Sequence, residues 1–357
     1  MNCIKIINNN ALDFNLQYIK HKLSPKTKLC AVVKDNAYGH GINNVIKTLL
    51  CYADYFAVAN VSEGKKLRAL TSLPIIVLGE CELECLNDIT ENNLEITISN
   101  LSILKQLAEK EKLKSVSVHL AIDSGMHRLG FNNKKDFINA LKLIAKSKNL
   151  ELKGLFSHIG DPQNTIRLEQ QKTIFDKYYA LVPNTINPLV HIANSDTMHT
   201  DNTMHCDMVR IGINMYGYGN KNLKPVMSVI AKIVNIIVLK NDDYIGYGST
   251  HRMPAGTKLG VIAIGYGQGF LRNNAQFGSV IINGKLCKIV ANICMDMTIV
   301  DITKATCQIG DYAIIMGQQG MHSIDANLLA TFNKTIPYEI LTNFDKIKNS
   351  MITHDCA

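Results

Sequence analysis

The sequence predicts an α/β chain in which an N-terminal (β/α)8 barrel is followed by a mainly β C-terminal domain. Three observations support this prediction: short apolar runs that recur with room for a helix between them, a count of eight such runs, and a change of pattern after Pro225. The chain has 357 residues, which is long enough for two domains. We therefore expect a barrel domain over residues 1–224 and a β-rich domain over residues 225–357.

Eight apolar runs, each flanked by polar or turn residues, are the expected strands of the first domain. Amphipathic segments lie between them, as at Glu169–Leu181, where apolar residues recur at helical spacing. Eight strands alternating with helices over roughly 210 residues is the count of a (β/α)8 barrel, although a doubly wound open sheet would show the same alternation. The expected strands are Leu29–Val33, Phe56–Ala59, Leu73–Leu78, Glu95–Ser99, Val116–Ile122, Leu152–Ser157, Leu189–Ala193 and Met208–Ile213.

After Pro225 the apolar runs follow one another without helical spacing until Ile324–Phe332. Asn283-Gly284 separates two of these runs and is typical of a type I′ hairpin, which joins antiparallel strands. The second domain is therefore expected to be mainly antiparallel. Its expected strands are Val226–Leu239, Leu259–Ile264, Ser279–Ile282, Leu286–Val290, Met297–Asp301 and Tyr312–Met316.

Composition and charge exclude several classes of function. The net charge of +8 is spread along the chain, and Trp is absent, so neither a basic arm nor a stacking platform for nucleic acid is expected. No apolar stretch approaches the ~18 residues of a membrane span, and Met1–Asn10 lacks the apolar core of a signal peptide. The ten cysteines form no C-x-x-C pattern and are typical of reduced thiols in a cytoplasmic protein. No metal site is expected.

Reactive and cationic residues follow the expected strands, where the active sites of parallel barrels lie. Lys34 comes directly after the first strand, and its buried neighbours would lower the pKa of its amine and favour formation of a Schiff base. For an isolated lysine, a solvated residue at a strand end would be the simpler interpretation. Residues of similar kinds follow other strands, namely Asp123, Arg128, His158, Asn194 and Ser195, and the eighth strand contains Arg210 and Gly212.

The segment 31–41, Ala-Val-Val-Lys-Asp-Asn-Ala-Tyr-Gly-His-Gly, resembles the pyridoxal-phosphate lysine motif of the alanine racemase family. Further segments resemble that family in the same order over nearly the whole chain. They are Asp123–Gly130, Ser157-His158, Ala193–Ser195, Met208–Ile213, Tyr247-Gly248, Ile264–Gly267, Cys294–Asp296 and Pro337–Glu339.

The resemblance implies a pyridoxal 5′-phosphate-dependent amino-acid racemase, most simply one that interconverts L- and D-alanine for peptidoglycan precursors. It also implies a homodimer whose active sites combine the barrel of one subunit with the C-terminal domain of the other. Lys34 would hold the cofactor and act as one acid/base, and Tyr247 of the partner subunit would be the other. Racemisation needs two such groups, because the Cα proton leaves one face and returns on the opposite face.

The resemblance assigns the remaining site residues as well. Tyr38, Ser195, Gly212, Ile213 and Tyr338 would bind the cofactor phosphate. Arg210 would face the pyridine nitrogen, and because arginine keeps its proton, that nitrogen would stay unprotonated. His158 would support the ring and link Tyr247 to Arg210. The expected substrate-binding residues are Arg128, Met295 and Tyr266, the last two from the partner subunit.

Several positions depart from the family pattern. Ala121 replaces a lysine that many members carry two residues before Asp123, and Gln268, Met297 and Asn214 also differ from the common residues. These changes leave open a racemase of broader or different specificity, for serine, lysine or arginine. An amino-acid decarboxylase is less favoured, since such enzymes place an acid where this chain has Arg210. A pyridoxal-phosphate carrier protein would resemble the barrel alone.

Overall fold

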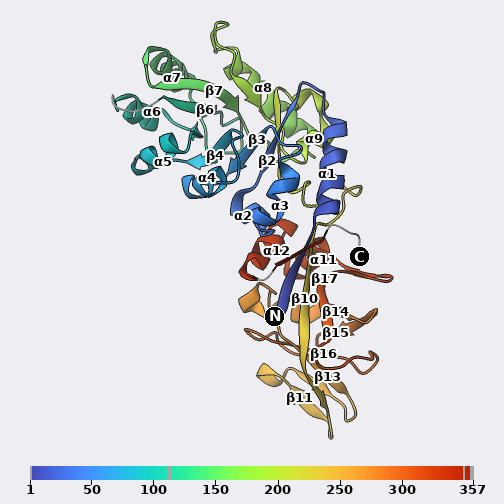
Figure 1. Cartoon of the computed structure of the whole chain (residues 1–357). Helices are drawn as coiled ribbons and strands as arrows, with labels where there is room; N and C mark the ends of the chain where they lie inside the picture. Colours follow the sequence, from blue (N-terminus) through green and yellow to red (C-terminus); the bar gives the residue numbers. More distant parts are fainter. Residues whose placement is uncertain (1, 111–114, 349, 354–357) are drawn as a thin grey trace. The chain divides into compact units, whose positions relative to one another are not determined.

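The computed structural model describes residues 2–110, 115–348 and 350–353 (Figure 1). Its internal contacts divide the chain into two compact units, which are described separately. The barrel unit comprises Asn15–Asp35 and Ile46–Met215. The β unit comprises Met1–Phe14, Asn36–Val45 and Tyr216–Ala357. The N-terminal segment and the segment after Lys34-Asp35 therefore belong with the C-terminal half of the chain.

Eight parallel strands form the sheet of the barrel unit, in the order β8-β7-β6-β5-β4-β3-β2-β9. The two ends of this order meet through backbone hydrogen bonds from Asp207 N to Val190 O (3.1 Å) and from Arg210 N to Ala193 O (2.9 Å), so the sheet closes. The predicted (β/α)8 barrel is confirmed. Its strands are β2 (Lys28–Val32), β3 (Tyr55–Val58), β4 (Ile75–Glu80), β5 (Leu94–Ile98), β6 (Val116–Ala121), β7 (Leu150–Phe156), β8 (Leu189–His191) and β9 (Met208–Ile211).

Helices connect these strands, and several of them have an asparagine as N-cap. The side chains of Asn60, Asn100, Asn133 and Asn164 accept hydrogen bonds from backbone amides of the first turn, which stabilises each helix start. The helices are α1 (Asn9–Lys22), α3 (Ile42–Leu49), α4 (Val61–Arg68), α5 (Leu86–Glu91), α6 (Leu101–Ala108), α7 (Lys134–Lys146), α8 (Thr165–Tyr179) and α9 (Thr197–Thr200), with the 3-10 turns η1 (Leu83–Cys85) and η2 (Asn202–Met204).

The β unit contains a nine-stranded sheet in which β15-β14-β17-β10-β1-β19 form the main path. The predicted hairpin is present: β14 and β15 pair antiparallel, and φ is 45° at Asn283 and 75° at Gly284, as a type I′ turn requires. The elements are β1 (Cys3–Asn8), β10 (Met227–Val238), β13 (Lys258–Ile262), β14 (Ser279–Ile282), β15 (Lys285–Lys288), β16 (Thr298–Asp301), β17 (Tyr312–Gln319), β18 (His322–Ile324) and β19 (Ser350–Thr353).

Smaller elements complete the β unit. The helix expected at Ile324–Phe332 is present as α11 (Ala326–Asn333). A separate ribbon is formed by β11 (Asp243–Ile245) and β12 (His251–Met253), and the short helices are η3 (Tyr247–Ser249), η4 (Tyr266–Gln268), α10 (Asn274–Phe277), α12 (Pro337–Asn343) and η5 (Phe344–Lys346). Within the described part of the chain, no helix has both the length and the apolar character to cross a bilayer.

The N-terminal strand β1 was not predicted, because its sequence mixes polar and apolar residues. It pairs antiparallel with β10 and parallel with β19, so it lies inside the sheet. Lys5, in the middle of this strand, is buried. Its ammonium donates to the carbonyl of Gly39 at 2.6 Å and lies 3.5 Å from a carboxylate oxygen of Asp345.

Candidate active site

Lys34 follows the C-terminal end of β2 and is half-buried. The segment is held in place by Glu63, at the start of α4. One carboxylate oxygen of Glu63 accepts from Asp35 N and the other from Ala59 N, both at 2.8 Å. Glu63 thus ties the end of β2 to the end of β3 by two charge-assisted hydrogen bonds. Its place in the sequence gave no sign of this role.

The backbone after Lys34 forms one turn of left-handed helix, α2 (Lys34–Tyr38). The φ angles are 53°, 52°, 57° and 53° from Asp35 to Tyr38, and Gly39 follows at 78°. Left-handed conformation costs about 1–2 kcal/mol for each non-glycine residue, so this turn stores strain that other contacts must offset. Gly39 cannot be replaced without cost, since a Cβ there would overlap the Leu341 carbonyl.

Three cations surround His158 at the C-terminal end of the barrel. Burial, followed by the charges of Arg210, Arg128 and Lys34, lowers the pKa of His158 to about 3, so its imidazole is neutral. Across the described residues, none of these three cations forms an ion pair with a carboxylate. Asp123, which lies two residues after β6, instead accepts hydrogen bonds from the backbone amides of Gly125 and His127 in its own loop, at 3.0 and 2.9 Å. The three cations therefore gather at the barrel opening without a directly paired carboxylate in the described part of the chain.

Arg210 lies on β9 with its guanidinium buried in the barrel interior. Burial lowers its pKa to about 10, which leaves it charged at neutral pH. It donates to the carbonyls of His191 and Ser157 at 2.5 and 2.7 Å, and one nitrogen lies 3.5 Å from His158 Nδ1. Its plane also lies over the ring of Phe156, 5.2 Å from the ring centre. Neutral acceptors and an aromatic face thus replace a direct counterion.

A line of hydrogen bonds links Arg210 to a buried carboxylate on the other side of the barrel interior. Arg210 Nη1 lies 2.8 Å from His191 Nδ1, His191 Nε2 lies 2.8 Å from His119 Nδ1, and His119 Nε2 lies 2.7 Å from Glu95 Oε2. We call these four residues the Arg210–Glu95 network. Since arginine only donates and a carboxylate only accepts, both imidazoles must carry their proton on Nε2.

The sequence analysis missed three members of this network. His119, His191 and Glu95 lie within apolar runs that were expected to be buried strands. Each is nearly or fully buried, and polar groups in such places are retained only with partners. A charged residue or a histidine inside an apolar strand was therefore the feature of the sequence that could have indicated a buried polar network.

The proposed phosphate-binding residues of the barrel unit lie together where β8 and β9 end. Ser195 is buried, and its Oγ accepts from Gly212 N at 3.0 Å. Ile213 follows Gly212, and Gly212 O accepts from Met215 N at 3.0 Å in a tight turn. A hydroxyl and successive backbone amides at a strand end form a suitable cradle for a phosphate.

The β unit contains Tyr38 and Tyr338, the two tyrosines that the resemblance assigns to the phosphate. The rings of Tyr38 and Tyr338 lie 5.9 Å apart, and that of Tyr216 lies 5.1 Å from Tyr38. Tyr38 is buried on the left-handed turn, whereas Tyr338 is half-buried in the first turn of α12. The structure therefore brings Tyr38 and Tyr338 together within this unit.

Tyr247 and Tyr266 line one surface pocket of the β unit, together with Arg272, Ile293 and Cys294. Tyr247 is 71% exposed and lies between two glycines with positive φ. Its carbonyl accepts from Asn292 Nδ2 at 2.9 Å. Met295, which follows Cys294, is also exposed. The three residues expected to reach a partner's active site thus share one accessible surface.

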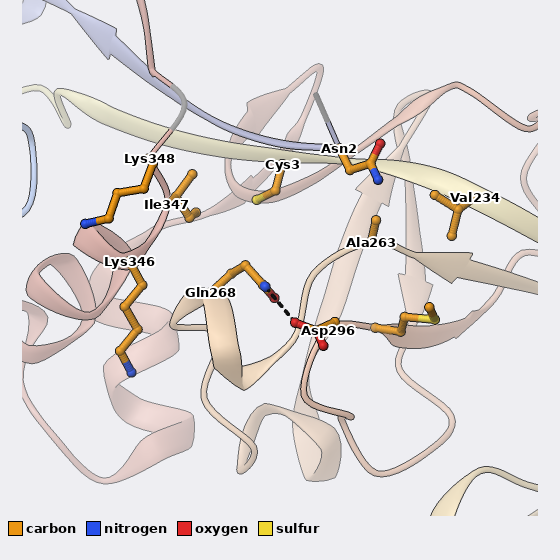
Figure 2. Close-up of a pocket in the computed structure, with 10 residues that line it drawn as sticks. Asn2, Cys3, Val234, Ala263, Gln268, Asp296, Lys346, Ile347 and Lys348 are labelled. Atoms are coloured by element: carbon orange, nitrogen blue, oxygen red, sulfur yellow. Dashed lines mark hydrogen bonds between the residues drawn. The ribbon is translucent and has the colours of Figure 1, made fainter.

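Two departures from the family pattern have structural consequences. In the barrel unit, Ala121 and Arg128 line one small cavity with Phe156 and His158. Arg128 is exposed, and in the described ranges no acceptor lies within hydrogen-bond distance of its guanidinium. In the β unit, Gln268 donates to Asp296 at 2.8 Å on one wall of a separate pocket, where Lys346 and Lys348 also lie (Figure 2). Gln268 thereby braces the loop that carries Met295.

Comparison with known proteins gives a consistent match over nearly the whole chain. The model of the alanine racemase N-terminal domain matches residues 7–220, and that of the alanine racemase C-terminal domain matches residues 226–351. An alanine racemase of Methylacidiphilum infernorum is 33% identical, covering 94% of this chain and 89% of the relative.

Solved structures agree with these sequence matches. An alanine racemase from Bartonella henselae with covalently bound pyridoxal phosphate has a TM-score of 0.88 and 26% identity, over 99% of this chain and 100% of that one. A histidine racemase from Leuconostoc mesenteroides has a TM-score of 0.89 and 25% identity, over 99% and 98% of the two chains.

Proposed function

Because this chain belongs to the alanine racemase family, we propose that it is a pyridoxal-phosphate-dependent enzyme that interconverts L- and D-alanine. The main support from the structure is the positive charge at the barrel opening. Lys34, Arg128 and Arg210 all act on His158, yet in the part of the chain that the structure describes none of them is paired with a carboxylate. This charge suits a ligand with a phosphate and a substrate with a carboxylate.

The residues present fit the cofactor. Lys34 would hold it through Nζ, and the phosphate would bind the Ser195 hydroxyl, the amides of Gly212 and Ile213, and the hydroxyls of Tyr38 and Tyr338. When bound, the cofactor ring supplies stabilisation for the negative charge that develops as the substrate loses its Cα proton. Arg210 would face the ring nitrogen.

Arg210 is suited to that position, since it can donate a hydrogen bond but does not give up its proton. Its donors already point into the Arg210–Glu95 network and to backbone carbonyls, so its orientation is held without the ligand. A ring nitrogen that stays unprotonated withdraws less charge, which disfavours side reactions such as transamination.

Two residues would handle the substrate proton. Tyr247 of the partner subunit would remove the Cα proton of L-alanine at its phenolic oxygen, and Lys34 Nζ would deliver a proton to the opposite face; the roles exchange for D-alanine. The exposure of Tyr247, together with Tyr266 and Met295, supports a homodimer with shared sites, because general acid–base groups work best when shielded from bulk water. We place this activity in the cytoplasm, in the supply of D-alanine for peptidoglycan.

The decisive experiment is chiral analysis after the cofactor-loaded protein is incubated with each L-amino acid separately. We expect rapid formation of D-alanine and slower or no conversion of other substrates. Absence of any racemisation, with cofactor bound, would overturn the proposal. Lys34→Ala should abolish covalent attachment of the cofactor, and mass spectrometry after borohydride reduction would locate the modified residue.

Tyr247→Phe tests the second proton-transfer group. The variant should retain the cofactor, because the tyrosine does not attach it, but should lose most activity with L-alanine. Normal racemisation by this variant would contradict the two-base assignment.

A second candidate is a racemase for another amino acid. Two observations support this second candidate: Ala121 leaves space beside Arg128, and a histidine racemase has the same fold. The same chiral analysis distinguishes the two. Release of carbon dioxide would instead indicate a decarboxylase, and cofactor binding without turnover would indicate a carrier protein.

A further inference from the structure

The strained left-handed turn, residues 35–39, is held by donors from several directions. Gly41 N donates to Asn36 O at 2.9 Å, and His40 donates to Ala37 O through both its backbone and its ring, each at 3.0 Å. The last carbonyl of the turn, that of Gly39, accepts from the buried ammonium of Lys5 at 2.6 Å. Lys5 therefore completes the set of donors that satisfies the turn.

Asp345 couples this ammonium to the beginning of the same turn. Its Oδ1 accepts from Asn36 Nδ2 at 2.8 Å and lies 3.5 Å from Lys5 Nζ. Asn36 Oδ1 in turn accepts from Ile42 N at 2.9 Å. Lys5 and Asp345 thus contact both ends of this backbone segment. Its left-handed conformation is intrinsically unfavourable for non-glycine residues, so it depends on such contacts.

The placement of Lys5 indicates a dedicated role. Its side chain is 4% exposed, and burying an ammonium is costly unless it is hydrogen-bonded and close to an opposite charge. The side chain that the turn orients is Tyr38, which packs against Tyr338 of α12. Asp345 lies in η5, directly after that helix, so the same contacts link the turn to the segment that carries Tyr338.

We propose that Lys5 and Asp345 are positioning residues that hold the left-handed turn and thereby orient Tyr38 for the cofactor phosphate. The proposal rests on the proposed function for its ligand, but the state of the turn can be measured without any ligand. Lys5 touches neither cofactor nor substrate in this proposal, and it acts only through the Gly39 carbonyl and Asp345.

The test compares Lys5→Met, which keeps the length of the side chain, with Asp345→Asn, which keeps an acceptor for Asn36. Lys20→Met is the control, because it removes a lysine whose ion-pair partner, Asp54 at 2.9 Å, lies outside the turn. Each protein is titrated with pyridoxal 5′-phosphate and, separately, with pyridoxal. Amide hydrogen exchange of residues 36–41 is measured in the protein without ligand.

We expect Lys5→Met to raise the Kd for pyridoxal 5′-phosphate by about ten-fold and to leave the Kd for pyridoxal within about two-fold, since one hydrogen bond to an ammonium is lost. Asp345→Asn should act in the same direction with a smaller shift. Amide exchange at residues 36–41 should be faster in both variants, and Lys20→Met should match the unsubstituted protein in every measurement.

Equal loss of affinity for both ligands would overturn the proposal, because it would indicate general disruption rather than a phosphate-specific effect. Unchanged affinity and unchanged exchange in both variants would also overturn it. If the unsubstituted protein bound neither ligand, the proposed function would fail, whereas the exchange measurement would still decide whether Lys5 holds the turn.

Discussion

Substitution of Gly154 by alanine should disrupt the buried Arg210–Glu95 network. Gly154, on β7, pairs directly with His119 on β6, and the imidazole occupies the space where a side chain of residue 154 would lie. A Cβ at this position would come within 3.0 Å of three ring atoms of His119, with Nδ1 nearest. That nitrogen accepts the hydrogen bond from His191.

The expected cost can be worked out from these contacts. Forced overpacking of a filled interior costs about 1–3 kcal/mol. Displacement of the ring also weakens its bonds to His191 and to the buried carboxylate of Glu95, and loss of a buried charge-assisted bond costs about 1.5–3 kcal/mol. The free energy of unfolding should therefore fall by about 2.5–6 kcal/mol, a large part of the usual total of about 5–15 kcal/mol.

Urea unfolding followed by circular dichroism provides the measurement, with Gly160→Ala as the matched control. A Cβ at Gly160 would meet only Met126 Cγ, at 3.7 Å, which is an ordinary contact. The control should change the free energy of unfolding by no more than about 0.5 kcal/mol. If Gly154→Ala unfolded at the same urea concentration as the control, the imidazole would not be confined as described, and the reasoning would be refuted.

Three further predictions concern a helix start, a hairpin and pH. Asn60→Ala should lower the free energy of unfolding in urea by about 1 kcal/mol, since the Asn60 side chain caps α4 at Glu63 N; an unchanged midpoint would contradict this. Gly284→Val should lower the free energy of unfolding by about 1–2 kcal/mol and so lower the melting temperature, because a β-branched residue is placed at positive φ. A melting temperature equal to that of the unsubstituted protein would count against the type I′ turn. Burial lowers the folded-state pKa of His40 and His158 from 6.5 to about 3, so the unfolded chain takes up protons that the folded one does not. Stability should therefore fall as pH drops below 6.5, by about 1.4 kcal/mol per pH unit for each histidine, and unfolding at pH 5 without proton uptake would disprove it.

The barrel could be predicted because its strands are buried on both faces. Each strand appears as a short apolar run, and the helices between them repeat apolar residues at a different period. The strand β1 could not be found in this way, since its central residue is a lysine whose burial depends on Gly39 and Asp345, distant in the sequence. The division of the chain into domains at residues 1–224 and 225–357 stays a prediction.

The site residues were identified through motif resemblance, and their roles stay predictions. Periodicity alone could indicate which residues follow a strand but not which of them meet. The left-handed conformation of Asp35–Tyr38 was not foreseeable, because none of these four residues is glycine and only the surrounding contacts impose it. Glu95 and Glu63 escaped notice for a related reason: each acts through partners on neighbouring strands.

The hydrogen bonds of the Arg210–Glu95 network all run in one direction, from the guanidinium to the carboxylate. Each imidazole accepts at Nδ1 and donates at Nε2, so a reversal at one ring would leave two donors or two acceptors facing each other unless the other ring reversed as well. The four groups behave as one cooperative unit with its positive end at Arg210 and its negative end at Glu95. The barrel interior thus has a fixed polar axis that runs across the strands from β9 to β5.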